Sequence, residues 1–192
     1  TMGAGIAYAL AGIGVHVTTV ETSEDSATRA RANIDGLYAD AVKRGKSTQD
    51  QADKALTARH DVRVGYDALP AAEIAIEAAF EDLTVKRQIF AALDKALPET
   101  AILATNTSYL DVNAIFKGLR NPERLLGLHF FAPAHVMKLL EVIRATQTSP
   151  QTLSTAFHLA QKLKKIAVEA GVCDGFIGNR ILTRYRQTTD LL

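Results

Sequence analysis

Short apolar runs alternate with longer helical segments along almost the whole chain. This alternation predicts an α/β fold, because two parallel strands need a crossover connection between them, usually a helix. The predicted strands are β-branched or continuously apolar, and they cover residues 15–20, 61–64, 73–79, 101–105, 124–131, 138–144 and 167–169. The predicted helices cover residues 3–14, 24–58 with a break near 44–47, 83–97, 111–118, 150–165, and 175 onward. We therefore expect a Rossmann-like, doubly wound and mostly parallel sheet with helices on both faces.

Length and composition limit the classes of protein that this chain can be. Its 192 residues suffice for one domain, or for one domain and a piece of another. The net charge of +1 gives no electrostatic reason to expect nucleic acid or an anionic membrane as a partner. No apolar run approaches the roughly 18–20 residues that cross a bilayer, so we expect no membrane span. The single cysteine, Cys173, excludes an internal disulfide and is expected to be a small packing residue.

Polar groups interrupt the apolar runs at three places. The stretch LGLHFFAPAHVMKLLEVI, residues 126–143, places His129 and Glu141 in runs that predict neighbouring buried strands. A third polar cluster, Asn106-Thr107-Ser108, directly follows the run AILAT. Ligands of open α/β sheets bind outside the carboxyl ends of the strands, so these groups are expected to face one site. A histidine that a carboxylate orients can act as a general base, whereas the alternative is a histidine that only packs in the core.

The first residues of the chain suggest a nucleotide site. TMGAG is consistent with the tail of a G-x-G-x-x-G turn in which Gly3 is the third glycine, at the start of a helix that receives a pyrophosphate. Glu21 ends the next strand, where an acidic side chain suits the hydroxyls of a ribose and would repel a 2′-phosphate. This pattern favours NAD over NADP. A helix of small residues followed by an ordinary strand-terminal glutamate is the alternative.

Several longer motifs together resemble the NAD-binding domain of the L-3-hydroxyacyl-CoA dehydrogenase family. The matching pieces are TMGAGIA, VETSED, IEAAFEDLTVK, ILATNTSYL, GLHFFAPAHVMKLLEVIR and VCDGFIGNRIL, in the order of the family and across almost the whole chain. The wording AHVMKLLEV and CDGFIGNR is most similar to the dehydrogenase portion of multifunctional fatty-acid β-oxidation enzymes. The resemblance implies an NAD-binding domain over residues 1–172 that is truncated at its first strand, which would leave a gap beside strand 15–20. It implies the beginning of a helical C-terminal dehydrogenase domain over residues 173–192.

The resemblance also implies roles for individual residues. His129 matches the catalytic base and Glu141 the carboxylate that orients it. Ser108 and Asn179 match groups that bind the substrate near its hydroxyl and thioester, and Ser108 is counted with the cofactor site as well. The remaining cofactor positions are Met2, Gly3, Glu21, Ala79, Phe80, Glu81 and Lys86. The family often carries an asparagine that contacts the cofactor where this chain has Ala132, so that contact is expected to be absent.

The activity that these positions imply is the oxidation of an L-3-hydroxyacyl-CoA to a 3-ketoacyl-CoA with NAD, with no metal. A fused enoyl-CoA hydratase module or a dimer is the implied assembly. Two alternatives stay open, namely a short-chain 3-hydroxybutyryl-CoA dehydrogenase and a fragment that binds the cofactor only in part. The basic run 43–46 either meets the phosphates of the acyl-CoA or is a solvated face. We expect a bacterial-type cytoplasmic location, and leave a mitochondrial or a peroxisomal one open.

Overall fold

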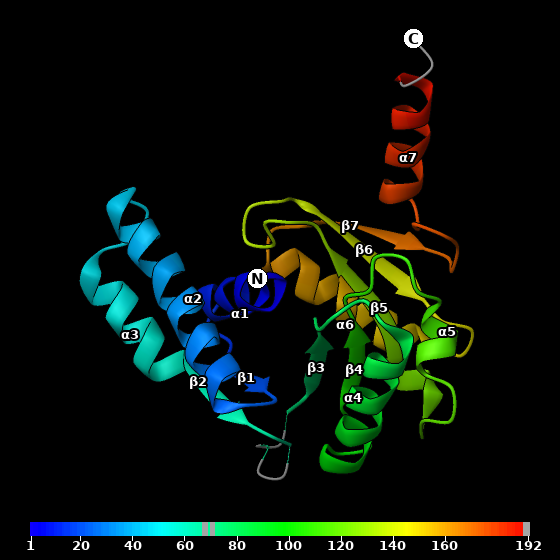
Figure 1. Cartoon of the computed structure of the whole chain (residues 1–192), viewed down its shortest axis with the longest axis horizontal. Helices are drawn as coiled ribbons and strands as arrows, with labels where there is room; N and C mark the ends of the chain where they lie inside the picture. The colour runs from blue at the N-terminus through cyan, green and yellow to red at the C-terminus, as the bar shows by residue number, and fades with distance from the viewer. Residues whose placement is uncertain (67–68, 70–71, 190–192) are drawn as a thin grey trace. The chain divides into compact units, whose positions relative to one another are not determined.

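The computed structural model describes residues 1–66, 69 and 72–189, which form an α/β fold (Figure 1). The chain divides into two compact units. The first comprises Thr1–Ala68 together with Phe131–Met137, and the second comprises Leu69–Phe130 together with Lys138–Leu192. The expected α/β class with a mostly parallel arrangement of strands is confirmed.

The first unit is built on a two-stranded parallel sheet. Strand β1 (Val17–Glu21) pairs with β2 (His60–Val64), and helices α1 (Met2–Gly12), α2 (Glu24–Lys43) and α3 (Gln49–Arg59) pack around them. Its core contains the buried residues Ala4, Ile34, Tyr38 and Ala52. The small residues of α1 leave little space between helix and sheet. This close packing is what the GAGIA sequence predicts for a nucleotide-binding helix.

The predicted break between α2 and α3 is confirmed. Gly45 has a φ of 66°, a left-handed conformation that a residue without Cβ adopts at little cost. Thr48 then caps α3, because its side chain accepts from the Gln51 N–H while the Gln51 side chain accepts from the Thr48 N–H. This reciprocal pair is the capping box that the sequence S-T-Q-D-Q contains.

The second unit is a five-stranded sheet in the order β3-β4-β5-β6-β7. Four helices and a 3-10 turn, η1 (Pro122–Arg124), connect or follow the described strands of this unit. The strands are β3 (Ile74–Glu77), β4 (Ile102–Thr105), β5 (Leu125–Phe130), β6 (Leu139–Arg144) and β7 (Ile166–Ala170), and the helices are α4 (Leu83–Ala96), α5 (Val112–Ile115), α6 (Pro150–Lys162) and α7 (Gly178–Thr189). Pairings are parallel except between β5 and β6, which are antiparallel.

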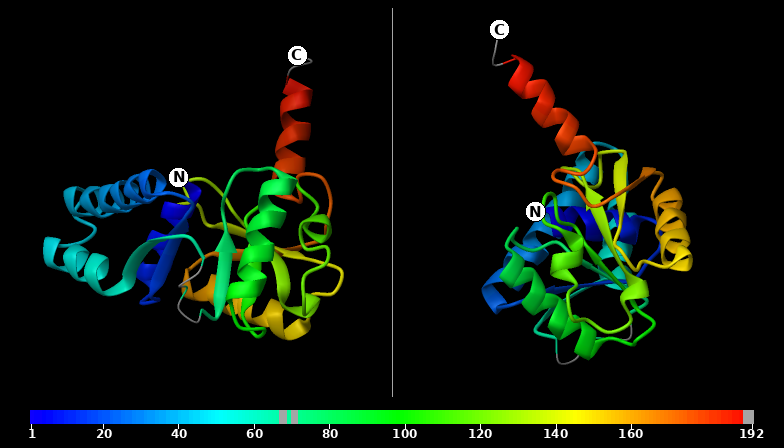
Figure 2. Two further views of the ribbon diagram at one scale, coloured as in Figure 1. Left: turned by 60° about the horizontal axis from the view of Figure 1, so that its bottom comes forward. Right: turned by 90° about the vertical axis from the view of Figure 1, so that its right-hand side faces the viewer.

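Because β5 and β6 are antiparallel, the strands on the two sides of this pair point in opposite directions, and helices cover both faces of the sheet. Helix α4 contacts β3 and β4, whereas α6 contacts β5, β6 and β7. Right-handed crossovers between strands that point in opposite directions place their helices on opposite faces. Figure 2 shows α4 and α6 on opposite sides of this sheet. Its strands are therefore covered twice, and β4 and β5 are buried along their whole length.

Two details of the fold bear on the expectations from sequence. Among the described residues β1 pairs with β2 alone, and the gap expected beside strand 15–20 stays a prediction. The last helix was expected from Gly175, but α7 begins at Gly178, because Gly175 and Phe176 have φ values of 68° and 48° and form a turn.

None of the described helices is both long and apolar enough to cross a membrane. The boundary between residues 172 and 173 stays a prediction, and residues 190–192 lie outside the described part of the chain.

Candidate active site

A buried imidazole–carboxylate pair lies in the middle of the second unit. His129 on β5 is directly opposite Glu141 on β6, and their exposed fractions are 3% and 0%. The Nδ1 atom of His129 is 2.7 Å from Oε2 of Glu141. The expected contact between the two side chains is therefore present. An ionised carboxylate only accepts hydrogen bonds, so Nδ1 carries the proton and the lone pair of the neutral ring is on Nε2.

Glu141 uses its other oxygen to hold the chain that enters α7. Its Oε1 accepts hydrogen bonds from the backbone N–H groups of Ile177 at 3.0 Å and Gly178 at 2.8 Å. These donors belong to the start of the helix, where N–H groups have no partner within the helix. The buried charge of Glu141 is thereby satisfied by three donors. Its position in an apolar strand is possible for this reason.

An aromatic side chain lies beside the imidazole. The ring of Phe176 lies tilted against it, with ring centroids 5.8 Å apart. Phe176 is fully buried and belongs to the turn that precedes α7. At the end of β5, the backbone N–H of Phe130 donates to Oδ1 of Asn106 at 2.8 Å, which ties the end of β5 to the loop after β4. The ring of Phe176 therefore limits the freedom of the His129 side chain, and the Asn106 contact fixes the backbone at the end of β5.

Ser108 and Asn179 lie at the same place. The Nδ2 group of Asn179, in the first turn of α7, donates to the backbone oxygen of Ser108 at 3.4 Å. Ser108 belongs to the loop that follows β4, next to the strand that carries His129. The structure therefore brings together four sequence-predicted residues from four different segments. They are His129 on β5, Glu141 on β6, Ser108 after β4 and Asn179 on α7.

Two of the predicted cofactor residues, Glu81 and Lys86, belong to a second network at the ends of β3 and β4, which meets the first site at Ser108. The ammonium group of Lys86 is fully buried and lies 2.8 Å from Oε1 of Glu77 and 3.3 Å from Oε2 of Glu81. Glu81 accepts at Oε1 from the hydroxyl of Thr107 and from the N–H groups of Ser108 and Tyr109. Burial alone raises the pKa of Glu81, but these hydrogen bonds and the charge of Lys86 outweigh it, so that the pKa is lowered.

The remaining residues of the β3–α4 loop differ in their exposure and in their hydrogen bonds. The N–H of Ala79 donates to Oε1 of Glu77 at 2.6 Å, so its backbone is fixed. The side chain of Phe80 is 79% exposed, the most exposed large apolar side chain among the described residues. Asp82 then caps α4 by accepting from the N–H of Val85.

The residues expected at the adenosine end of a dinucleotide belong to the first unit. Met2 and Gly3 begin α1, and Glu21 is the last residue of β1. Helix α1 is joined to β1 by a short connection, so the two elements run in opposite directions. The start of α1 therefore lies toward the carboxyl end of β1. The first turn of α1 carries no acidic side chain, so its positive end suits a phosphate. These features fit a dinucleotide.

A hollow of about 380 Å³ lies at the start of α1. Its walls are Thr1, Met2, Ala4 and Gly5 of the N-terminal segment, Asn33 and Leu37 of α2, and residues 132–135. A Cβ atom on Gly5 would lie 3.3 Å from that of Ala134, so a glycine allows α1 to approach the 131–137 loop. Ala132, which stands where the family often has asparagine, is therefore in the wall of this hollow.

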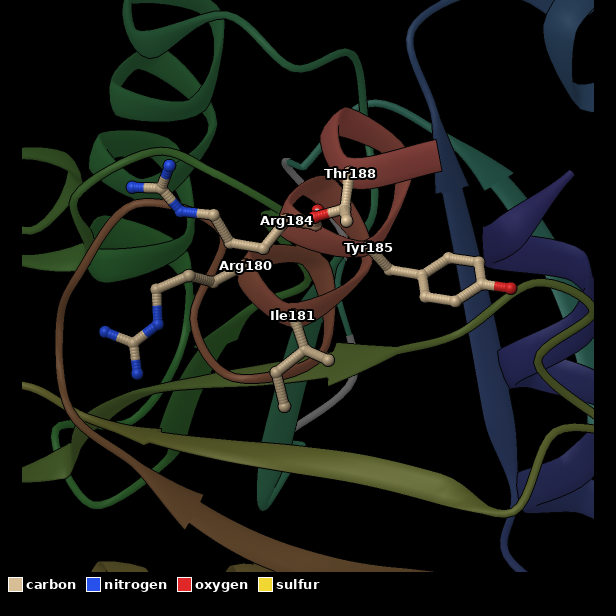
Figure 3. Close-up of a pocket in the computed structure, with 5 residues that line it drawn as sticks. All are labelled: Arg180, Ile181, Arg184, Tyr185 and Thr188. Atoms are coloured by element: carbon tan, nitrogen blue, oxygen red, sulfur yellow. The ribbon is translucent and has the colours of Figure 1, made fainter. Parts of the chain in front are cut away.

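A second hollow, of about 570 Å³, is formed by α7 alone. Arg180, Ile181, Arg184, Tyr185 and Thr188 line it, and Figure 3 shows their side chains extending from the helix in different directions. Three acidic, histidine or cysteine side chains at a distance suited to a metal ion are not found together in the described residues. Cys173 is half-buried and donates to the backbone oxygen of Phe176.

Sequence reasoning missed Glu77, which is central to the network at β3. The signal was available, because Glu77 is a carboxylate within the apolar run EIAIEAA, as Glu141 is within LLEVI. It also missed Thr105, whose hydroxyl donates to Oε2 of Glu77 at 2.7 Å.

A mostly parallel sheet with helices on both faces, which carries a buried histidine–glutamate pair near the carboxyl end of β5, is typical of the nucleotide-binding α/β class. Residues 1–173 match the family model of the 3-hydroxyacyl-CoA dehydrogenase NAD-binding domain, and the chain belongs to this family. The cofactor of the family domain is therefore NAD, as expected from the resemblance.

Individual relatives agree with this family. The peroxisomal bifunctional enzyme of Cavia porcellus is 38% identical over 192 residues, which are all of this chain and 26% of that protein. The crystal structure of 3-hydroxybutyryl-CoA dehydrogenase from Escherichia coli K12 has a TM-score of 0.93 at 38% identity, over 98% of this chain and 40% of that one. The dehydrogenase part of multifunctional enzyme 1 from C. elegans has a TM-score of 0.81 at 33% identity, over 99% of this chain and 43% of that one. The chain thus spans about a quarter of the length of the bifunctional relative.

Proposed function

We propose that the protein containing this chain oxidises the 3-hydroxyl group of an L-3-hydroxyacyl-CoA to a ketone, with NAD as the oxidant, in fatty-acid β-oxidation. The observation that carries the proposal is the buried pair of His129 and Glu141, with its 2.7 Å hydrogen bond, in a chain of this family. Removal of a proton from the alcohol oxygen as hydride leaves C3 is the chemistry that such a pair suits.

His129 is assigned the role of general base. Its Nε2 lone pair accepts the hydroxyl proton, while the C3–H bond breaks and the nicotinamide receives the hydride. The imidazolium that forms is stabilised by the carboxylate of Glu141, which is held on its other side by Ile177 and Gly178. A positioned general base contributes about 10²–10⁴-fold to rate.

The other assigned residues position the reactants. Ser108 and Asn179, which are joined by a hydrogen bond, are placed on the hydroxyl and thioester region of the substrate. Glu21 is placed on the adenosine ribose, and Met2 and Gly3 on the pyrophosphate. The further cofactor positions are Ala79, Phe80, Glu81 and Lys86, of which the exposed Phe80 is the side chain most accessible to a ligand.

A short-chain 3-hydroxybutyryl-CoA dehydrogenase is the second candidate, and the structural similarity to the Escherichia coli enzyme of that name favours it. An assay of NADH formation with 3-hydroxyacyl-CoA substrates of increasing chain length separates the two. The assay uses the protein as its gene encodes it, with His129→Gln as the inactive control. Turnover of medium and long chains supports the main proposal, and turnover of the four-carbon substrate alone supports the second. Cofactor binding without any turnover would support a non-catalytic fragment and contradict both.

The assembly is also part of the proposal. The bifunctional relatives are about four times longer than this chain, and this supports a fusion with an enoyl-CoA hydratase module, while a dimer is the alternative expectation. The mass of the natural polypeptide tests the fusion, since 20.7 kDa is the mass of the chain alone. For the compartment we propose the cytoplasm, with the mitochondrion and the peroxisome as the alternatives, of which the names of the relatives favour the peroxisome. Fractionation of the source cells distinguishes them.

A further inference from the structure

A row of four aromatic rings runs through the first unit. Tyr8 on α1 and Tyr38 on α2 meet edge to face, with ring centroids 4.7 Å apart. Tyr8 also meets the ring of His135 at 5.5 Å, and Tyr38 meets that of His60, the first residue of β2, at 5.7 Å. Tyr38 is 6% exposed and belongs to the core of this unit. A histidine therefore joins the core of both helices to the start of β2.

Only one of the two ring nitrogens of His60 has a partner. Its Nε2 lies 3.2 Å from the hydroxyl oxygen of Tyr38. Its Nδ1 is buried and has no hydrogen-bond partner among the described residues. A neutral imidazole has one N–H donor, whereas the protonated ring has two. Protonation would thus place a charged group with an unpaired N–H at a buried position, which costs more than a bare lone pair.

The groups around His60 oppose its protonation on balance. Burial lowers the pKa of His60, and the charge of His16, just before β1, lowers it further, while Asp35 on α2 raises it by less. Burial raises the pKa of Tyr38, and the nearby charge of Arg59 at the end of α3 only partly offsets this. The hydroxyl of Tyr38 therefore keeps its proton over the whole range in which a histidine titrates.

We propose that His60 is a pH-sensitive contact of the first unit: neutral, it binds Tyr38 and holds α2 against β2, and protonated, it leaves this position and loosens the unit, which weakens the binding of NAD. The effect on NAD rests on the proposed function, in which Met2, Gly3 and Glu21 are placed on the cofactor. The effect on the first unit does not depend on it.

The contact is connected to the proposed adenosine end by both elements that it touches. His60 is opposite Val17 in the pairing of β1 and β2, and the same pairing ends at Glu21. Tyr38 packs on Tyr8 of α1, the helix whose first residues are assigned to the pyrophosphate. Loss of the His60 contact therefore disturbs the strand and the helix that carry the assigned cofactor residues.

The direction of the effect follows from proton binding. The pKa of His60 is lower in the folded protein than in the unfolded chain, so the folded state binds fewer protons. The contribution of His60 to stability is complete above the unfolded pKa of about 6.5 and is lost as the pH falls through the folded value. Between the two values the equilibrium constant of unfolding should rise by up to about tenfold for each pH unit.

The test uses the protein as its gene encodes it, between about pH 7.5 and about pH 5.5, where a histidine titrates. Amide hydrogen exchange, corrected for the intrinsic effect of pH, should show protection in β1 and β2 falling by about fivefold or more, while β4 and β5 keep theirs. The dissociation constant of NAD, measured by titration calorimetry, should rise by about threefold or more over the same range. An NMR titration of the His60 ring should give a pKa below about 6.5.

Three variants isolate His60 from other titrating groups. His60→Phe keeps a ring beside Tyr38 but cannot be protonated, so the pH dependence of protection in β1 and β2 and of NAD affinity should be lost. His16→Gln removes a charge that lowers the pKa of His60 and should move both transitions to higher pH. His158→Gln, on the exposed side of α6 in the second unit, is the matched control and should change neither. If His60→Phe does not fold, His16→Gln and the ring titration decide.

Several results would overturn the proposal. A ring pKa of His60 at or above about 6.5 would do so, because neutral His60 would then have no preference for the folded state. The same pH dependence in His60→Phe as in the unchanged protein would assign the loosening to another group. Constant NAD affinity while the protection of β1 and β2 falls would overturn the effect on the cofactor. Failure of the unchanged protein to oxidise any 3-hydroxyacyl-CoA would contradict the proposed function alone, since none of these measurements depends on turnover.

Discussion

His129 and Glu141 occupy directly opposite positions on two antiparallel strands, with Nδ1 2.7 Å from Oε2. Opposite residues of such a pair project from the same face of the sheet with their Cβ atoms about 4.5–5.5 Å apart. The contact is therefore a consequence of strand register. A slip of one residue would turn one of the two side chains to the other face of the sheet and separate them.

Replacement of the proposed base gives the most direct test of the mechanism. His129→Gln keeps a polar side chain of similar length but cannot take up the hydroxyl proton. We expect kcat to fall by about two to four orders of magnitude. NAD affinity should change little, because the change removes no proposed cofactor contact. Steady-state kinetics with a 3-hydroxyacyl-CoA measures this, and His158→Gln on the exposed side of α6 is the matched control. Near-normal turnover by His129→Gln would show that another group is the base.

Glu141 has two functions in the structure, and two substitutions separate them. Glu141→Gln keeps an acceptor but loses the charge that stabilises an imidazolium, so kcat should fall while the fold is retained. Glu141→Ala removes the acceptor as well and leaves His129, Ile177 and Gly178 without this partner, which should cost about 1–3 kcal/mol of unfolding free energy for each unsatisfied buried donor. Urea unfolding and kcat are measured on both variants. Equal stability of the two would contradict the role of Glu141 at the start of α7.

The sequence was sufficient to predict the pair, because a carboxylate in an apolar strand requires a partner. The antiparallel direction of β6 could have been predicted as well, because the connection between β5 and β6, residues 131–138, is shorter than the dozen or more residues that a parallel crossover needs. Glu77 carried the same signal in its apolar run and was missed. The partners of Glu81 are different, because two of the four are backbone N–H groups. Every residue but proline has such a group, so only the folded loop selects Ser108 and Tyr109.

Gly127 has no side chain where β5 meets β6, and a methyl group there should disturb the register that the pair needs. A Cβ atom on Gly127 would lie 2.8 Å from the Cβ of Ile143, the residue opposite it. A branched Cβ on a central strand cannot rotate away, so Gly127→Ala should destabilise the protein by about 1–3 kcal/mol and reduce kcat. Gly36→Ala is the control: nothing lies near its Cβ in the middle of α2, and it should stabilise the protein by about 0.5–1 kcal/mol. If Gly127→Ala were as stable as the unchanged protein, β6 would shift at little cost to accommodate the new methyl group.

The choice between NAD and NADP should depend on Glu21 at the end of β1. A carboxylate at this position would accept hydrogen bonds from ribose hydroxyls, and the like charge of a 2′-phosphate at the same place would be unfavourable. The residues that follow, Thr22 and Ser23, offer no cation for the phosphate. Glu21→Ala should therefore raise the KM for NAD and narrow the preference for NAD over NADP, whereas Glu24→Ala should change neither. The ratio of kcat/KM values for the two cofactors measures this. Equal use of both cofactors by the unchanged protein would contradict the role of Glu21.

The lowered pKa of Glu81 predicts how its contribution to stability depends on pH. Burial alone raises this pKa, and the hydrogen bonds from the 107–109 turn and the charge of Lys86 lower it by more. A carboxylate whose pKa is lower in the folded state binds fewer protons there than in the unfolded chain. Its stabilising effect is therefore complete above the unfolded pKa of about 4.3 and is lost as the pH falls through the folded value. The urea midpoints of unfolding are measured for the unchanged protein and for Glu81→Gln from neutral pH downward. The difference between the two midpoints should be constant near neutral pH and should shrink only in this acidic range. A difference that shrinks already near neutral pH would assign the titration to another group.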